Sequence, residues 1–175
     1  MRRIAILGNA GGGKSTLARG IRDELGLPLH SIDQMQWRPG WERAPKMEFV
    51  AAHEQAILGE RWIIDGWGDF EAIEKRLCLA DTIVLIDYPV RQHYWWAMKR
   101  QIKCLFRARE DGPPGCPMIP MTWPMLKMIG EIDRHLMPRI RALAEAHAAH
   151  SKLYHIRSSK DRAGFVSALK TSSRH

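Results

Sequence analysis

The sequence predicts an α/β fold in which a parallel sheet carries helices on both of its faces. Short apolar runs of strand length alternate along the chain with longer segments that repeat apolar residues at helical spacing. This alternation indicates parallel strands joined through helices, and such helices cover both faces of the sheet. The 175 residues suffice for one full hydrophobic core, so we expect a single domain over 1–175.

The first half of the chain contains three predicted strands, each followed directly or after a loop by a helix. In chain order its elements are a strand at 3–7, a helix at 15–25, a strand at 27–32, a loop rich in Trp, Pro and Gly at 34–45, a helix at 46–60, a strand at 61–65 and a helix at 69–79. The strands are short apolar runs, and Gly66 stops the third of them. The helix at 46–60 repeats Phe49, His53 and Ile57 at helical spacing.

The second half begins with a strand that is both apolar and β-branched. Its elements are a strand at 81–87, a helix at 91–107, an irregular segment at 109–121, a helix at 122–150, a strand at 152–156 and a helix at 161–170. Pro138 is expected to kink the long helix. Proline and glycine fill 109–121, and a loop of this length is typical of a lid, which we place at about 107–122. The residues that the helix at 91–107 is expected to bury are Tyr94, Met98, Ile102 and Leu105.

Residues 8–15, Gly-Asn-Ala-Gly-Gly-Gly-Lys-Ser, match the pattern of a phosphate-binding P-loop. They lie between a predicted strand and a predicted helix, the order that this loop requires. Glycines let backbone N–H groups turn toward phosphate oxygens, and the start of the helix adds partial positive charge. Lys14 is expected to reach the β- and γ-phosphates of ATP, and the Ser15 hydroxyl to bind Mg²⁺. The predicted nucleotide-binding residues are Gly8, Gly11, Gly12, Gly13, Lys14, Ser15 and Thr16.

Aspartates follow three of the predicted strands, at the edge where parallel sheets bind their ligands. Asp65 is expected to hold Mg²⁺ opposite Ser15, with a turn or helix-cap role as the alternative. Asp33 either accepts a proton from a hydroxyl group of the acceptor or belongs to a turn. Asp87 precedes Tyr-Pro, and the choice between a structural turn and the edge of the active site stays open.

The formal net charge of +8 permits two classes of partner. Between Arg91 and Arg109 the chain carries six basic and no acidic residues, which fits either a phosphate-binding wall or nucleic acid. Nucleic acid is not favoured, because no helix-turn-helix or similar element is apparent. No apolar run is long enough to span a bilayer, so we expect a cytoplasmic protein without a membrane partner. The three cysteines form no Cys-x-x-Cys pair and indicate neither a disulfide frame nor a zinc site.

Several segments spread over the chain form a recognisable combination. They are the P-loop, His30-Ser-Ile-Asp33, Trp37-Arg-Pro-Gly-Trp41, Trp62-Ile-Ile-Asp-Gly66, Leu85-Ile-Asp-Tyr-Pro89 and Gly115-Cys-Pro117. With them the chain resembles, through nearly its whole length, the adenylate-kinase-like P-loop proteins often called DNA topology modulation proteins. The resemblance implies the three-layer P-loop NTPase fold, with a five-stranded parallel sheet of order 2-3-1-4-5 and a mobile lid that closes over ATP. It also implies that Arg109 is a lid arginine.

One departure from adenylate kinases bears on the acceptor. Those enzymes follow the Asp-Gly of the third strand with an aromatic residue, Pro and Arg, and that arginine binds AMP. Here Gly66 is followed by Trp67-Gly-Asp-Phe70, without Pro or Arg. Their AMP-binding segment also lacks an aspartate like Asp33, which kinases of small hydroxyl compounds possess. A hydroxyl-bearing acceptor is therefore favoured over AMP.

We therefore expect a kinase that transfers the γ-phosphoryl group of ATP to a nucleoside, a nucleotide or another small hydroxyl compound. The catalytic residues predicted are Lys14, Asp33, Arg107 and Arg109, with the two arginines moving in with the lid. The substrate-binding residues predicted are Asp33, Trp37 and Gly66. Two alternatives stay open, a nucleotide-dependent regulator that binds DNA and a bare ATPase.

Overall fold

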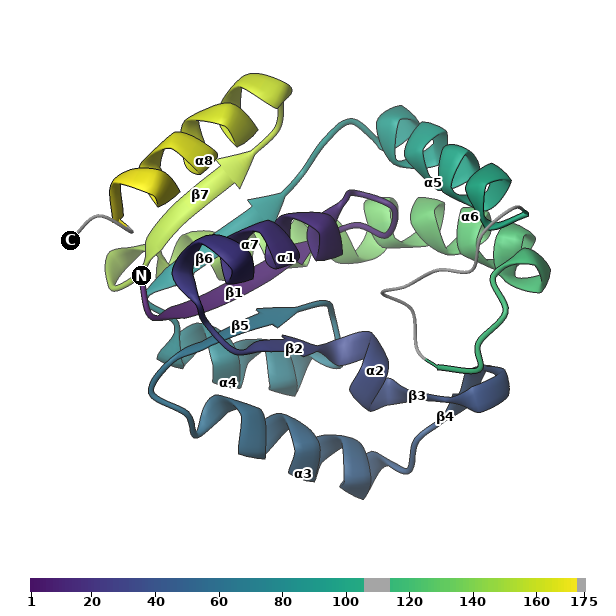
Figure 1. Cartoon of the computed structure of the whole chain (residues 1–175), viewed down its shortest axis with the longest axis horizontal. Coiled ribbons are helices and arrows are strands. Elements are labelled where there is room, and N and C mark those ends of the chain that lie inside the picture. The colour runs from purple at the N-terminus through teal and green to yellow at the C-terminus, as the bar shows by residue number, and fades with distance from the viewer. Residues whose placement is uncertain (106–113, 173–175) are drawn as a thin grey trace.

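A five-stranded parallel sheet forms the centre of the molecule (Figure 1). The structure is a computed structural model, and it describes residues 1–105 and 114–172. The strands of this sheet are β1 (Arg3–Gly8), β2 (Leu29–Ser31), β5 (Trp62–Asp65), β6 (Thr82–Ile86) and β7 (Lys152–Ile156). They lie side by side in the order β2-β5-β1-β6-β7. Counted along the chain within this sheet, that is the order 2-3-1-4-5, which confirms the prediction.

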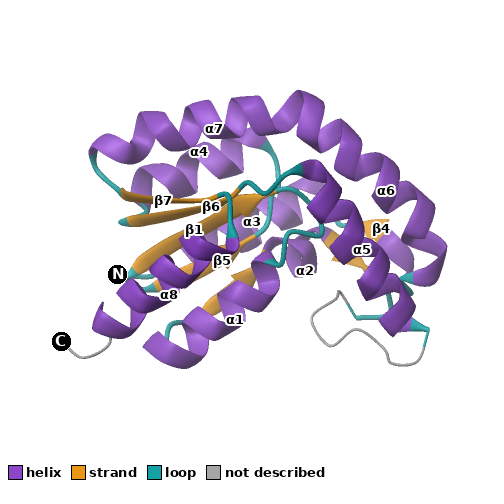
Figure 2. Cartoon of the chain, turned by 90° about the horizontal axis from the view of Figure 1, so that it is seen from above, coloured by secondary structure: helices purple, strands orange, loops and turns teal. Residues whose placement is uncertain are grey.

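Helices cover both faces of the sheet (Figure 2). The helices are α1 (Lys14–Leu25), α3 (Lys46–Ile57), α4 (Phe70–Leu79), α5 (Val90–Cys104), α6 (Thr122–Glu131), α7 (Met137–Ala146) and α8 (Ser159–Ser172). Helices α1 and α8 lie on one face, and α3, α4 and α7 lie on the other. Helices α5 and α6 pack against each other beyond the carboxyl ends of the strands.

The alternation of side chains along β1 supplies both halves of the core. Ala5 and Leu7 join the cluster on the α3, α4 and α7 face, and Ile4 and Ile6 join the cluster on the α1 and α8 face. All four side chains are fully buried. Because successive side chains of a strand point to opposite faces, a strand covered on both faces must be apolar throughout. This is the physical reason for the continuous apolar run that the sequence shows.

The segment predicted as a loop at 34–45 has regular structure, so that prediction was wrong. It contains the short helix α2 (Ile32–Gln36) and a two-stranded hairpin of β3 (Trp37–Arg38) and β4 (Glu42–Arg43), joined by a 3₁₀ turn at Pro39–Trp41. Gly40 takes a positive φ of 80° in this turn, which its lack of a Cβ permits. Two-residue strands are too short to produce an alternating pattern, which is why periodicity missed them.

The predicted buried face of α5 was wrong for Met98, Ile102 and Leu105, although Tyr94 is partly buried against α6. Its buried residues are His93, Ala97 and Gln101, whereas Ile102 and Leu105 are 54% and 61% exposed. The helix turns its small Ala97 toward Met125 and Ile129 of α6, with which it forms one apolar cluster. The sequence pattern contains two competing faces, and contact with α6 selects the less apolar one.

The long helix predicted at 122–150 breaks near Pro138, as expected. A π-helical turn at Ile132–Leu136 separates α6 from α7, and a 3₁₀ turn at His147–Ala149 ends the run. Proline lacks the N–H group that would bond one turn back, and the π turn absorbs this interruption. A further 3₁₀ turn, Ile119–Met121, precedes α6. Among the described residues, no helix has the length and apolar character needed to cross a membrane.

Candidate active site

The P-loop connects β1 to α1 at the carboxyl edge of the sheet. Its backbone adopts positive φ at Gly8, Gly11 and Gly13, with values of 143°, 74° and 76°. Residues with a Cβ are strained in this region, so these positions require glycine. Lys14 Nζ donates a hydrogen bond of 2.9 Å to Asn9 O, so the lysine folds across its own loop. Thr16, in the first turn of α1, is exposed.

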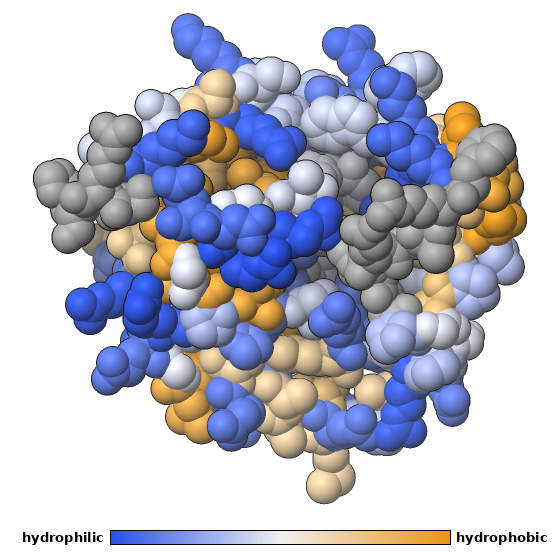
Figure 3. Space-filling model, in the orientation of Figure 1, coloured by the Kyte–Doolittle hydropathy of each residue, from blue (hydrophilic) through white to orange (hydrophobic). Residues whose placement is uncertain are grey.

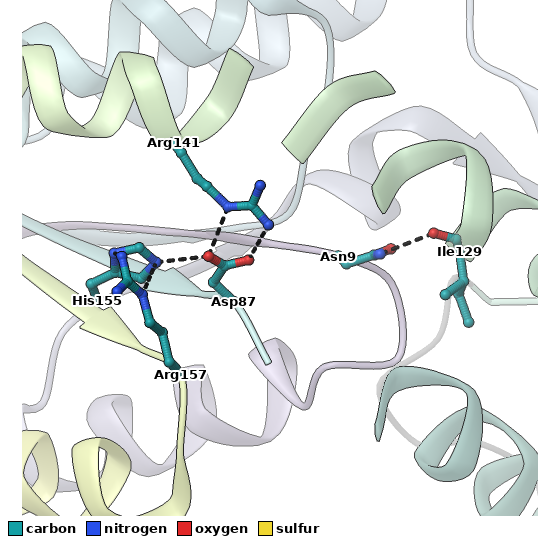
Figure 4. Close-up of polar contacts among 6 residues, drawn as sticks. All are labelled: Asn9, Asp87, Ile129, Arg141, His155 and Arg157. Carbon is teal, nitrogen blue, oxygen red and sulfur yellow. Dashed lines mark hydrogen bonds and ion pairs between the residues drawn. The ribbon is translucent and has the colours of Figure 1, made fainter. Parts of the chain in front are cut away.

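Hydrogen bonds to α6 and from the turn after β5 hold the first residues of the loop in place. Asn9 Nδ2 donates to Ile129 O of α6 at 3.0 Å (Figure 4), and Asn9 Oδ1 accepts from the Ala10 N–H at 2.7 Å. Trp67 Nε1 donates to Gly8 O at 2.7 Å from the turn after β5. The backbone of the loop is therefore fixed from two sides before any ligand arrives.

His93 of α5 packs against the P-loop. It was not among the predicted site residues. It is 1% exposed, and its Nδ1 lies 3.0 Å from Ala10 O, which can only accept, so Nδ1 carries the proton. A Cβ on Gly12 would lie 2.7 Å from His93 Cε1, and one on Gly11 would lie 2.9 Å from His93 O. Burial lowers the pKa of His93, so the ring is neutral near pH 7. No pattern in the sequence links a histidine 80 residues away to the P-loop.

Asp65 is a buried carboxylate beside the P-loop lysine and serine. Its side chain is 4% exposed, and burial raises its pKa, against the opposing effects of the Lys14 charge and a hydrogen bond with Ser15. Its Oδ1 is buried and has no hydrogen-bond partner in the described part of the chain. A buried oxygen in this condition costs free energy unless a ligand or cation approaches it.

The oxygens of Ser15 and Asp65 fit a magnesium ion. Mg²⁺ prefers hard oxygen ligands, and it usually binds through one or two carboxylates together with substrate phosphates and water. The hydroxyl group of Ser15 and the carboxylate of Asp65 are such ligands, and they are in contact at the mouth of the P-loop. Within residues 1–105 and 114–172, no three His, Cys, Asp or Glu side chains group so as to hold a metal ion by themselves.

Asp33 lies on the side of the site opposite the P-loop. It occupies the first turn of α2, directly after β2, and is half-buried. Strand β2 pairs with β5 so that Ser31 is opposite Asp65, which brings the two strand ends together. The negative charge of Asp33 contributes to raising the pKa of Asp65. The two carboxylates therefore share one electrostatic environment.

The turn after β5 is built on a buried arginine. Gly66 has a φ of 117°, and a Cβ there would lie 2.9 Å from Ile32 Cβ. Arg76 of α4 is fully buried and donates from one nitrogen to Gly66 O at 2.5 Å and to Trp67 O at 2.8 Å. Burial lowers the pKa of Arg76 to about 10, against the attraction of Asp65, so it stays charged at neutral pH. Arg76 holds the turn and has no surface left for an acceptor.

The hairpin β3–β4 and the segment 115–117 are joined, and we call this junction the clasp. Trp37, a predicted acceptor residue, is half-buried there with its ring 5.7 Å from that of Trp41. The guanidinium of Arg43 lies 5.6 Å from the Trp37 ring. Two segments that the sequence analysis singled out separately thus meet in space. The hydrogen bonds of the clasp are Gly40 N to Gly115 O at 2.9 Å, Trp41 Nε1 to Pro117 O at 2.7 Å and Cys116 Sγ to Arg38 O at 3.1 Å.

Asp87, left open by the sequence, is fully engaged by other side chains (Figure 4). Arg141 of α7 donates to both of its carboxylate oxygens at 2.8 Å, and His155 Nε2 of β7 lies 2.8 Å from one of them. Burial alone would raise the pKa of Asp87, but these hydrogen bonds lower it below the usual value. The residue therefore connects α7 with the ends of β6 and β7. Arg107 and Arg109, predicted as catalytic, lie outside the described residues.

Solved structures of shikimate kinases share this fold. The shikimate kinase of Acinetobacter baumannii in complex with shikimate is 13% identical, with a TM-score of 0.53, over 99% of this chain and 89% of that chain. The shikimate kinase from Bacteroides thetaiotaomicron is 14% identical, with a TM-score of 0.50, over 99% and 97%. No protein-family model and no curated protein matches the chain. The fold is the α/β fold of P-loop kinases, with a five-stranded parallel sheet flanked by helices.

Proposed function

We propose that this protein is a P-loop kinase that transfers the γ-phosphoryl group of ATP to a hydroxyl group of a small acceptor. The observation that carries the proposal is the cluster of Lys14, Ser15 and Asp65 at the mouth of a preformed glycine loop. The buried carboxylate costs stability, one of its oxygens has no partner among the described residues, and the Ser15 hydroxyl and the Lys14 charge both act on it. Asp33 adds a second carboxylate within electrostatic reach, on the acceptor side.

On the donor side, the loop and Lys14 would bind the phosphates. Phosphoryl transfer depends on alignment and charge neutralisation more than on covalent chemistry by the enzyme. Lys14 now donates to Asn9 O, and exchange of this bond for phosphate oxygens costs little because the lysine is already oriented across the loop. Ser15 and Asp65 would hold Mg²⁺, which screens the phosphate charge when bound.

On the acceptor side, Asp33 would accept the proton of the attacking hydroxyl group. Its position supports this role, since Asp33 follows β2 at the edge of the sheet where parallel sheets bind their ligands, and β2 ends beside Asp65. Trp37 and Gly66 are proposed to contact the acceptor. Arg107 and Arg109 are proposed to complete the charge neutralisation with the lid at about 107–122.

Two observations support a small hydroxyl compound over a nucleoside monophosphate. Arg76, the arginine that donates to the Asp65-Gly66 turn, is buried beneath that turn. Arg38 is paired with Glu48 on the surface of the hairpin. The A. baumannii shikimate kinase, which has the same fold and was solved in complex with shikimate, agrees with this choice.

Membership of the subgroup called DNA topology modulation proteins is part of the proposal. Two of the segments that carry this resemblance, Trp37–Trp41 and Gly115–Pro117, form the clasp. Because these two segments hydrogen-bond to each other, the clasp gives one structural reason why both motifs occur in the same chain. The cellular label attached to this subgroup describes an effect and does not define a chemistry.

The decisive experiment is a phosphoryl-transfer screen with ATP and Mg²⁺. Nucleosides, nucleoside monophosphates, shikimate and small polyols are tested for ADP formation, and product mass identifies the phosphorylated compound. A kinase gives acceptor-dependent ADP and a product heavier by one phosphoryl group. A bare ATPase gives phosphate release that no acceptor changes. A DNA-binding regulator consumes no ATP with any acceptor and shows DNA affinity that falls steeply with salt.

A further inference from the structure

The outward face of α5 carries four large apolar side chains that nothing in the described chain covers. Trp95, Met98, Ile102 and Leu105 are 60%, 39%, 54% and 61% exposed. Their spacing of three, four and three residues places them along one side of the helix. An extended apolar row of this kind is uncommon on a protein that has no partner, and it indicates an interaction surface.

The same helix is basic and contains no acidic residue from Val90 to Cys104. Arg91, Lys99 and Lys103 are exposed beside the apolar row. Lys99 Nζ lies 4.8 Å from the Trp95 ring, so charge and aromatic surface are presented together. Figure 3 shows strongly hydrophobic surface next to hydrophilic surface at the right edge of the molecule, where Figure 1 places the end of α5.

We propose that the outward face of α5 binds to the surface of an anionic lipid bilayer. A helix with tryptophan and aliphatic side chains on one side and lysines at its margins is typical of helices that lie in the membrane interface. The apolar row enters the boundary between headgroups and acyl chains, and Arg91, Lys99 and Lys103 meet the anionic headgroups. The sequence analysis excluded only a spanning segment, and it assigned Met98, Ile102 and Leu105 of this row to the core. The exposed position of the row therefore revises the expectation of no membrane partner.

Charge decides against the other possible occupants. In a symmetric dimer through α5, each basic row would face its own copy without an acidic counterpart, and like charges repel. Nucleic acid would satisfy the charges, but three of the four apolar side chains are not aromatic and cannot stack on bases. An anionic bilayer accepts both the aliphatic and the basic side chains.

The test is co-sedimentation of the full chain with lipid vesicles in the absence of nucleotide. One set of vesicles contains phosphatidylcholine alone, and the other also contains phosphatidylserine. We expect binding to the second set that weakens with salt. Ile102→Asp should abolish this binding, and Lys103→Glu should weaken it at least about fivefold, since a basic residue at an anionic surface contributes about that factor. The control Met47→Asp places the same charge at a residue of α3 that is 86% exposed, and it should bind as the original chain does.

Four outcomes overturn the proposal. The first is an absence of binding to anionic vesicles, and the second is binding that Ile102→Asp leaves unchanged while circular dichroism shows a folded protein. The third is a change from dimer to monomer in Ile102→Asp by light scattering. The fourth is loss of oligonucleotide binding in Lys103→Glu without vesicle binding. Because no nucleotide or acceptor is present, these results are independent of whether the kinase proposal holds.

Discussion

The two sides of the candidate site are held in different ways. On the donor side, Asn9 of the P-loop donates to Ile129 O, backbone carbonyls of the loop accept from Trp67 and Lys14, and His93 packs against the loop. On the acceptor side, two-residue strands form a hairpin whose exposed Arg38–Glu48 ion pair contributes little stability. Phosphates are bound by backbone N–H groups, so the donor side needs a fixed main chain. Acceptors are recognised by side chains, so the acceptor side can vary without changing the chemistry.

The largest expected effect lies on the donor side. Lys14→Ala removes the cation nearest the transferred group, and we expect turnover to fall by roughly 10³-fold or more, as for other cations that stabilise this transition state. The measurement is the initial rate of acceptor-dependent ADP formation. Lys127→Ala, a change at an exposed lysine of α6, is the control and should keep full activity. Undiminished turnover in Lys14→Ala would sink the kinase assignment.

Asp33→Asn tests the chemistry of the acceptor side. If Asp33 is the base, turnover should fall by about 10²–10⁴-fold, the range that general base catalysis supplies. The KM for ATP should change little, because the P-loop is untouched. The rate is compared with that of Asp23→Asn, which changes an exposed aspartate of α1. A normal rate in Asp33→Asn would remove it as the base and leave it a turn residue.

Lowering the pH should reduce the free energy of unfolding through His53 of α3, on the acceptor side of the molecule. His53, on the buried side of α3, is 2% exposed, and burial, followed by the charge of Arg76, lowers its pKa to about 4. The unfolded chain takes up this proton near pH 6.5, so stability falls as the pH drops from there toward about 4, by on the order of 3 kcal/mol from this residue. Urea unfolding over this pH range measures the loss. His53→Leu should flatten the profile, and an unchanged slope in that variant would show that other groups cause it.

Gly12→Ala tests whether His93 fixes the loop. The added Cβ would lie 2.7 Å from His93 Cε1, and overpacking of this kind costs about 1–3 kcal/mol. Nucleotide affinity by calorimetry should therefore fall by roughly 5- to 150-fold, and His93→Ala in the same chain should restore part of it. Gly20→Ala is the matched control, because a Cβ there has no neighbour within 4 Å and should stabilise α1. Equal affinities for Gly12→Ala and Gly20→Ala would contradict the role of His93.

The smallest effect is expected at the clasp. Trp41→Phe removes the hydrogen bond to Pro117 O and keeps most of the ring, a loss of about 0.5–1.5 kcal/mol. The KM for the acceptor should rise a few-fold while the KM for ATP stays constant. Trp123→Phe, at a tryptophan that is 78% exposed, is the control and should change neither constant. A rise in the KM for ATP alone would assign the clasp to the donor side instead.

The sequence predicted what depends on backbone geometry and strand order. The glycines of the P-loop and the strands that end at Asp33, Asp65 and Asp87 followed from local patterns, and the structure has the predicted sheet. The sequence did not predict His93 or the clasp, because each depends on contacts between residues more than 70 positions apart. The outward face of α5 was missed for another reason. Its apolar row looks like a core face, and only the packing of Ala97 against α6 decides which side is inside.

The contact between His93 and the glycines of the loop has a consequence for protein engineering. The eight residues of the motif are not a transferable module, because Gly11 and Gly12 fit the backbone and ring of a histidine on another helix. A P-loop copied from this chain into a different scaffold would lack the packing that His93 supplies. Its glycine backbone could then leave the conformation that binds phosphate. Within homologues, the same contact predicts paired replacement, so that a larger residue at position 12 accompanies a smaller one at position 93.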